Sequence, residues 1–181
     1  DATAPSSGWT AEIAGARAMR PGGLLMDAGS TKMRIGRAAA GALRGREISF
    51  VGGHPMAGSD GPGPGASDPR LFEGRPFILT ASIGPVPNAD NSARAVARAV
   101  GARPICLSAS EHDAWVAMIS HLPHVVAVAL VLEAAAFRRG RPLALAAGSF
   151  RSATRVAASG TEMLLDLLLS NSRNVVALLR R

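Results

Sequence analysis

The chain has 181 residues, with 20 basic and 13 acidic side chains and a formal net charge of +7 at pH 7. Hydrophobic residues make up 48% and charged residues 18%, which excludes a wholly disordered polymer and is typical of a chain that folds around a core. Aromatic residues are only 4%, so we expect a core of Ala, Leu and Val. The single cysteine, Cys106, allows neither an intrachain disulfide nor a cysteine zinc cluster and favours a reducing compartment.

The apolar stretches and the charge distribution predict a soluble, cytoplasmic protein. The first ten residues are small and polar, without the basic start and apolar run of a secretory signal. The most apolar stretch, residues 125–137, contains Glu133 and is expected to be too short to span a bilayer. The arginines are scattered with no aromatic platform between them, so we expect no nucleic-acid partner and no membrane partner. We expect instead that a few of the arginines bind a small anionic substrate.

Helix and strand patterns alternate through the first half of the chain. Strands separated by helices of this length predict right-handed crossovers and a mainly parallel sheet. In chain order, the sequence predicts a helix over 10–19, a strand over 23–28, a helix over 31–43 with Ser30 as its N-cap, a strand over 48–52, a long Gly/Pro-rich loop over 53–76, a strand over 77–81, a helix over 88–100 and a strand over 103–107.

The second half has no strand signal. Residues 110–139 predict one long helix kinked at Pro123, because proline removes a backbone hydrogen bond. After a connection over 140–148, two further helices are predicted over 149–158 and 161–181. The last helix carries an apolar stripe at helical spacing, expected to be core or a subunit interface: Leu164, Leu167, Leu168, Val175, Leu178 and Leu179. The layout is therefore α/β followed by all-α, with a boundary near Ser108.

His54 is the first candidate for chemistry. It follows a predicted strand directly, in the sequence GGHPMAGSDG. In open α/β sheets ligands bind at the carboxyl ends of strands, and glycines let the backbone approach a ligand closely. From the residues alone, a catalytic histidine and a loop histidine that only packs are equally good interpretations.

The other three histidines have less specific surroundings. His121 and His124, in SHLPH, are three residues apart on nearby helix faces and could bind a metal. No matching pair of carboxylates accompanies them, so we expect hydrogen bonding and no metal site. His112, in SEHD near a predicted helix start, is expected to be structural.

Two further segments could bind an anionic or polar ligand group. Residues 29–32 (GSTK) follow a predicted strand and begin a predicted helix, where a hydroxyl and backbone amides can bind such a group. A plain N-cap serine is the alternative there. Arg155, early in a predicted helix, could bind a carboxylate through two hydrogen bonds or be an ordinary surface arginine.

Taken together, these motifs resemble those of the prephenate dehydrogenases, a group that includes arogenate and cyclohexadienyl dehydrogenases. The resemblance extends from about Gly22 to Asn174 and rests on five segments in the same order and at about the same spacing: DAGSTK, FVGGHPMAGSD, LFEGRPFILT, EHDAWVAMISHLPH and GSFRSATRVAAS. It implies the C-terminal part of a Rossmann-like nucleotide-binding domain over 1–108, followed by part of a helical substrate and dimerisation domain over 109–181.

The resemblance implies an enzyme of tyrosine biosynthesis that oxidatively decarboxylates prephenate to 4-hydroxyphenylpyruvate with NAD or NADP. Arogenate, giving tyrosine, is the alternative substrate, and a cytoplasmic homodimer is implied. The glycine loop that holds the pyrophosphate in this family lies upstream of the DAGSTK-like motif and is not among these residues. The chain therefore looks like an internal fragment, expected to be inactive alone and to bind NAD weakly. The second hypothesis is a non-catalytic helical dimerisation module.

Family roles carry over to individual residues as follows. His54 matches the catalytic histidine that hydrogen-bonds the ring hydroxyl of the substrate, and Ser30, with Gly29, lies near that hydroxyl and the nicotinamide. Arg155 matches the arginine that binds the ring carboxylate. The remaining residues of the substrate pocket in this assignment are His124, its neighbour His121, and the polar–acidic pair Ser59 and Asp60. Three positions depart from the common pattern, which affects the shape of the pocket mouth: Ser149, Ser152 and Leu164.

Overall fold

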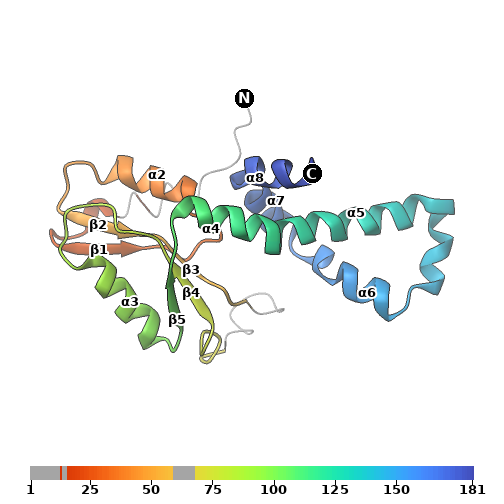
Figure 1. The fold of residues 1–181 in the computed structure, drawn as a ribbon, viewed down its shortest axis with the longest axis horizontal. Coiled ribbons are helices and arrows are strands. Elements are labelled where there is room, and N and C mark those ends of the chain that lie inside the picture. The colour runs from red at the N-terminus through yellow and green to blue at the C-terminus, as the bar shows by residue number, and fades with distance from the viewer. Residues whose placement is uncertain (1–12, 14–15, 59–67) are drawn as a thin grey trace. The chain divides into compact units, whose positions relative to one another are not determined.

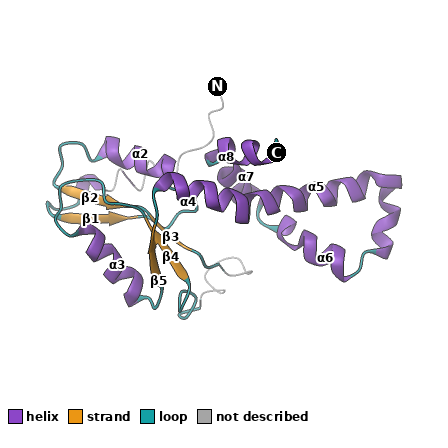
Figure 2. Ribbon diagram, viewed as in Figure 1, coloured by secondary structure: helices purple, strands orange, loops and turns teal. Residues whose placement is uncertain are grey.

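The structure, a computed structural model, describes residues 13, 16–58 and 68–181. The chain divides into two compact units, Asp1–His112 and Asp113–Arg181. Within the described part of the first unit, strands alternate with helices, whereas the second unit is helical (Figure 2). The predicted class, α/β followed by all-α, is confirmed.

The elements of the first unit lie close to their predicted positions, with ends that differ by a few residues. Half of the predicted helix over 10–19 lies outside the described residues, and Ala16–Ala18 form a short 3-10 helix. The elements that follow are β1 (Gly23–Met26), α2 (Met33–Ala42), β2 (Ile48–Val51), β3 (Gly53–Pro55), β4 (Pro76–Leu79), α3 (Ala89–Ala99) and β5 (Arg103–Cys106) (Figure 1).

These strands form two small sheets. Strand β1 pairs with β2 in parallel, and β4 pairs with β5 in parallel, as the crossover pattern predicts. Strand β3 runs antiparallel to β4, within a segment predicted to be entirely loop. The prediction of a loop is therefore wrong for residues 53–55, which follow β2 directly and pair with the edge of β4. The pairing continues at Met56, whose N–H donates to Pro76 O at 2.8 Å.

Helices α2 and α3 cover opposite faces of the strands, as alternating side chains on β2 require. Ile48 and Phe50 pack with Ile35 and Ala39 of α2 in one core cluster. Val51, on the other face, packs in a second cluster with the α3 residues Ala89, Ala93 and Ala97. The four-residue spacing of these alanines puts small side chains along one helix face, which lets α3 lie close to the strands.

The second unit is built around one long helical run. Helix α4 (Ala109–Val116) continues through a π-helical segment (Ala117–His121) into α5 (Leu122–Ala136). A 3-10 helix over Phe137–Leu145 contains a sharp change of direction at residues 138–140, whose φ angles are positive. The chain then forms α6 (Gly148–Thr154), a 3-10 turn (Arg155–Ala158), α7 (Thr161–Ser170) and α8 (Ser172–Leu179).

Pro123 affects the long run differently from the predicted kink. The N–H of Leu122 donates to Ala117 O, five residues earlier, so the turn before the proline is a π turn. A π turn is wider than an α turn, and it accommodates a residue that has no N–H and whose ring would clash with the preceding turn. The helix therefore stays continuous through Pro123 because the turn before it is widened.

The two predicted C-terminal helices are each divided. The helix predicted over 149–158 changes from α to 3-10 at Thr154, whose hydroxyl donates to Phe150 O at 2.7 Å. The helix predicted over 161–181 breaks at Asn171, which lies between two serines. Ser and Asn side chains compete with the backbone for hydrogen bonds and disfavour a continuous helix. The apolar stripe is partly covered: Val175 is buried, whereas Leu179 is 52% exposed.

The length of the apolar helical run corrects one expectation. The run Ala109–Leu145 has 37 residues and is long and apolar enough to cross a membrane, by length and composition only. The prediction that the apolar stretch is too short to span a bilayer is therefore wrong. Core helices of soluble proteins meet the same criterion, so the finding alone assigns no membrane location.

Candidate active site

His54 lies in the middle of β3, half-buried and opposite Ile78 of β4. The two glycines before it are required by close packing. A Cβ on Gly53 would lie 2.5 Å from Asp27 O and 2.9 Å from Cε1 of Phe77. A Cβ on Gly52 would lie 2.8 Å from Oγ1 of Thr80. The GGH sequence thus lets the backbone that carries His54 approach the end of β1 closely.

The ring of His54 contacts a second histidine. Its Nδ1 atom lies 2.8 Å from Nε2 of His112, and the two rings meet edge to face with centroids 5.0 Å apart. His112 is only 1% exposed and stands in the first turns of α4. The sequence predicted a purely structural His112, and its single SEHD motif gave no signal for this contact.

The donor of this hydrogen bond depends on which tautomers the two rings adopt. If Nδ1–H of His54 donates to His112, Nε2 of His54 carries a lone pair and can accept a proton. If His112 donates, Nε2 of His54 carries the hydrogen and cannot accept one. Only the first arrangement also holds when His54 is protonated, because Nδ1–H then still donates to the same acceptor.

Asp27, directly after β1, joins two segments that carry predicted site residues. Its Oδ2 accepts the N–H of Gly29 at 2.9 Å, and its Oδ1 accepts the N–H of Gly53 at 2.9 Å. Lys32 forms a buried ion pair with the same carboxylate and also donates to Gly53 O. The Lys32 side chain is fully buried and that of Asp27 is 8% exposed. From the sequence, Lys32 was assigned no role beyond its place in GSTK, and Asp27 was not singled out.

Ser30 is half-buried in the turn between β1 and α2. Helix α2 begins at Met33 with Lys32 at its N-cap, so the prediction that Ser30 caps this helix is wrong. The amide of Gly29 donates to Asp27 within the chain, and the anion or polar-ligand site over residues 29–32 stays a prediction. Ser30 and His54 are related through Asp27, which holds the residue preceding each of them.

His124 of α5 has a tautomer fixed by its surroundings. Its Nδ1 lies 2.8 Å from Ser120 O, and a carbonyl oxygen can only accept, so Nδ1 carries the hydrogen. The other nitrogen, Nε2, is then an acceptor and lies 3.4 Å from the hydroxyl of Ser159. His124 is half-buried, and this one lone pair can accept from Ser159 or, in its place, from a ligand hydroxyl or N–H. Nothing in the sequence pattern pointed to Ser159.

His121 is 1% exposed and lies in the π-helical segment. Its Nδ1 is 3.2 Å from Nδ2 of Asn171, which also donates to Asp113 O at 2.7 Å. The Asn171 side chain, itself oriented by an N–H from Asn174 at 2.8 Å, thus ties the α7–α8 junction to the long helical run. Hydrogen bonding, the expectation for this histidine, is confirmed.

Arg155 starts the 3-10 turn that packs against α5, the helix that carries His124. Its side chain is exposed. Ser59 and Asp60 lie outside the described residues. Among the residues that the structure describes, no group of three or more His, Cys, Asp or Glu side chains is arranged to hold a metal ion.

Comparison with known proteins places both units in one family. The family model of the prephenate dehydrogenase nucleotide-binding domain matches residues 10–106, and that of the prephenate dehydrogenase dimerization domain matches residues 108–181. A prephenate dehydrogenase of Lactococcus lactis is 38% identical over 155 residues, 84% of this chain and 42% of the relative.

Solved structures agree with this result. The arogenate dehydrogenase of Synechocystis has a TM-score of 0.79 at 27% identity, over 94% of this chain and 61% of that one. The prephenate dehydrogenase of A. aeolicus, in complex with hydroxyphenyl propionate and NAD+, has a TM-score of 0.70 at 30% identity, over 86% of this chain and 54% of that one. The chain thus spans about half the length of these proteins, and it belongs to the prephenate dehydrogenase family.

Proposed function

We propose that this chain supplies the catalytic histidine and the substrate-binding helices of a cytoplasmic, homodimeric dehydrogenase that oxidatively decarboxylates prephenate. The observation that carries the proposal is the His54–His112 pair, held beside the end of β1 by Asp27, which accepts the amides of Gly53 and of Gly29. The family match, which pairs a nucleotide-binding domain with a dimerization domain, supports it.

The residues present fit the nicotinamide end of a dinucleotide. The half-buried Ser30 turn follows a parallel strand at its carboxyl end, where such ligands bind. The 181 residues contain no G-x-G-x-x-G sequence for the pyrophosphate. The nicotinamide, when bound, supplies the acceptor for a hydride. The proposed contacts to it are Ser30 and Gly29, and the choice between NAD and NADP is part of the test below.

His54 acts as the proton acceptor in the proposed reaction. Prephenate has a ring carboxylate and, across the ring, a carbon that bears hydrogen and a hydroxyl. The C–H bond breaks as hydride leaves, the bond to the carboxylate breaks with its electron pair entering the ring, and carbon dioxide departs. Nε2 of His54 accepts the hydroxyl proton during hydride transfer and returns it to the phenol oxygen of the product. A positioned base of this kind contributes about 10²–10⁴ in rate.

The second unit supplies the proposed substrate contacts. Arg155 binds the ring carboxylate through charge-assisted hydrogen bonds. His124, whose Nε2 is an acceptor, contacts a hydroxyl or N–H of the substrate together with Ser159. His121, Ser59 and Asp60 complete the pocket in this assignment. Arogenate differs from prephenate by an ammonium in place of the side-chain ketone, and the arogenate dehydrogenase among the similar structures makes it the second candidate substrate.

A chimeric enzyme tests the proposal. The segment of the Lactococcus lactis relative that aligns with this chain is replaced by the corresponding residues of this chain, and formation of NADH or NADPH is followed with prephenate and with arogenate. We expect oxidation of prephenate, and we expect His54→Asn to lower kcat by about 100-fold or more while KM changes little. His121→Asn, at a buried histidine that we expect to be a neighbour of the site and not the base, is the comparison variant and should lower kcat far less. A folded, dimeric chimera that oxidises neither substrate would overturn the proposal.

The 181-residue chain alone provides a second measurement. Because it has no glycine loop, we expect weak NAD binding or none by calorimetry. An NAD dissociation constant in the micromolar range would contradict this expectation. If the chimera is inactive and the chain still self-associates, the alternative of a non-catalytic dimerisation module is favoured.

A further inference from the structure

We propose that the buried Asp27–Lys32 pair is a positioning clamp that holds the backbones of Ser30 and His54 in a fixed relation. The inference rests on the proposed function for its catalytic meaning. The hydrogen bonds on which it depends lie within residues 27–54, and they can be measured in the 181-residue chain without any substrate.

The carboxylate of Asp27 uses one oxygen for each of two segments. Oδ2 holds the amide of Gly29, the residue before Ser30, and Oδ1 holds the amide of Gly53, the residue before His54. These two segments are far apart in sequence, and one rigid group with two acceptor oxygens fixes both. Hydrogen bonds to a charged acceptor are stronger than neutral ones, so each tether restrains its backbone more than an ordinary loop contact would.

Lys32 completes the clamp on the side of His54. Its ammonium donates to Gly53 O, the carbonyl of the peptide bond that leads into His54, and pairs with Asp27. Gly53 is therefore held at both its N–H and its C=O. Asp27 thus fixes the peptide plane between Gly52 and Gly53, and Lys32 fixes the next one, between Gly53 and His54.

Stability alone does not account for such a pair. Removing two charges from water is costly, and replacing a buried ion pair by uncharged side chains of similar size is often neutral or stabilising. A buried charged pair that bonds three backbone groups next to two proposed site residues is better explained by the geometry that it imposes. Gly52 and Gly53 support this reading, since a Cβ on Gly52 would lie 3.2 Å from Cδ of Lys32 and one on Gly53 would lie 2.5 Å from Asp27 O.

The test is the double variant Asp27→Asn/Lys32→Met in the 181-residue chain. It removes both charges at nearly constant volume, so the fold should be retained by circular dichroism. An Asn side chain has one acceptor oxygen and can hold Gly29 or Gly53, but not both. We expect the amide of at least one of these glycines to exchange with solvent about tenfold faster or more, while the amide of Phe50, bonded to Ile83 O, keeps its protection.

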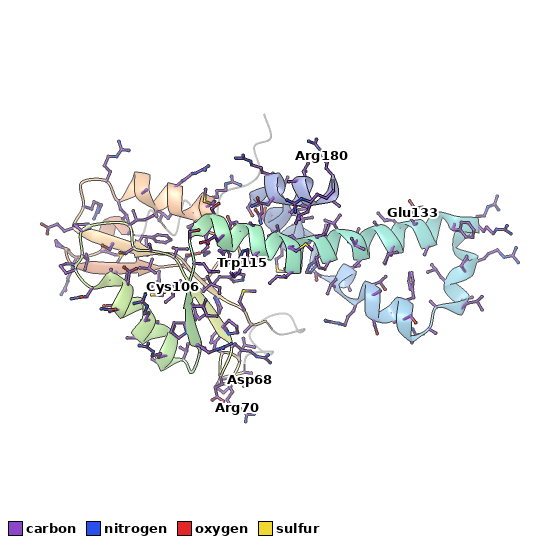
Figure 3. All side chains as sticks on the ribbon, viewed as in Figure 1. Asp68, Arg70, Cys106, Trp115, Glu133 and Arg180 are labelled. Atoms are coloured by element: carbon purple, nitrogen blue, oxygen red, sulfur yellow. The ribbon has the colours of Figure 1, made fainter. Side chains whose placement is uncertain are left out.

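A matched control is provided by Asp68 and Arg70, an exposed pair on the loop before β4 whose charged atoms are 4.0 Å apart (Figure 3). Asp68→Asn/Arg70→Gln should leave both glycine amides protected. In the chimeric enzyme, the clamp variant should lower kcat about tenfold or more with KM little changed, and the control should not. Unchanged protection of both glycines in a folded clamp variant would overturn the inference, as would unchanged kcat in an active chimera. If the parent chimera is inactive, the proposed function fails, and the exchange measurement still decides whether the clamp exists.

Discussion

Nδ1 of His54 and Nε2 of His112 meet at 2.8 Å across 58 residues of sequence, which makes a buried residue of α4 the partner of the proposed catalytic ring. A histidine whose Nδ1 is held in this way presents Nε2 in a defined direction. His112 is therefore expected to affect the chemistry through His54, without touching the substrate.

Substitution of His112 should test this relationship. His112→Phe removes the acceptor, and we expect kcat of the chimeric enzyme to fall about tenfold, the equivalent of losing roughly 1.4 kcal/mol from one hydrogen bond. His112→Gln should retain most of the activity, because its amide oxygen can accept the same bond. Nitrogen NMR of the His54 ring in the chain should show Nδ1 protonated in the parent and a mixture of tautomers in His112→Phe. A parent ring protonated at Nε2 would show that the donor is His112.

Arg155 is expected to act in substrate binding. Because the ring carboxylate is already charged before the reaction, Arg155→Ala should raise KM about 10- to 100-fold and change kcat far less, as expected for a charge-assisted contact worth about 1.5–3 kcal/mol. Arg151→Ala, one helical turn away on α6, is the control and should behave like the parent. A collapse of kcat at constant KM would show that Arg155 acts in the chemical step.

Gly53 should tolerate no side chain. A Cβ there would lie 2.5 Å from a backbone oxygen and 2.9 Å from the Phe77 ring, so Gly53→Ala should lower the free energy of unfolding by about 1–3 kcal/mol. Gly58→Ala, in the same sequence motif, meets nothing within 4 Å and should leave stability nearly unchanged. Urea unfolding of the two variants measures the difference, and equal midpoints would contradict the packing described for Gly53.

The second unit should self-associate. It exposes large apolar side chains, among them Val126 (47%) and Leu130 (42%) of α5 and Phe137 (59%) directly after that helix. Exposed patches of this kind usually mark an interface. We expect light scattering to give a dimer and Val126→Glu/Leu130→Glu to shift it towards monomer, with the exposed Ser152→Glu as control. A parent chain that is monomeric, or that requires detergent to stay in solution, would contradict this prediction.

The start of α4 should contribute to acid sensitivity. The Ser108 hydroxyl donates to Glu111 at 2.6 Å and accepts the Glu111 N–H at 3.1 Å, a capping box that lowers the pKa of Glu111 from its ordinary value of 4.5. A carboxyl group whose pKa is lowered on folding stabilises the folded state at pH values above its ordinary pKa. This contribution is lost as the pH falls through the lowered pKa. Ser108→Ala should therefore reduce stability at neutral pH and flatten its decline below pH 4.5, whereas Ser110→Ala should not. If the melting temperatures of the parent and of Ser108→Ala change with pH in the same way over this range, the prediction is wrong.

The sequence by itself determined the order of helices and strands, the family and the motifs around His54, because these depend on local periodicity and on short segments. At Pro123, Asn171 and Gly53 the structure differs from what local periodicity predicts. The chain forms a π turn before Pro123 through a bond to the preceding turn, and an added strand at Gly53 that pairs with β4. At Asn171 the helix breaks, and the Asn171 side chain binds Asp113 O, 58 residues earlier.

Only the tertiary structure decided which side chains complete the site. Asp27, His112 and Ser159 lie within segments that carry the family resemblance, but no local pattern says what they bind. Their significance lies in what they contact: two glycine amides, the ring of His54 and the Nε2 atom of His124. Buried polar groups must find partners when they leave water, and those partners come from whatever the fold brings within hydrogen-bond distance. The pairing of Asp27 with the residues before Ser30 and His54 therefore follows from tertiary packing, and it cannot be derived from the order of residues along the chain.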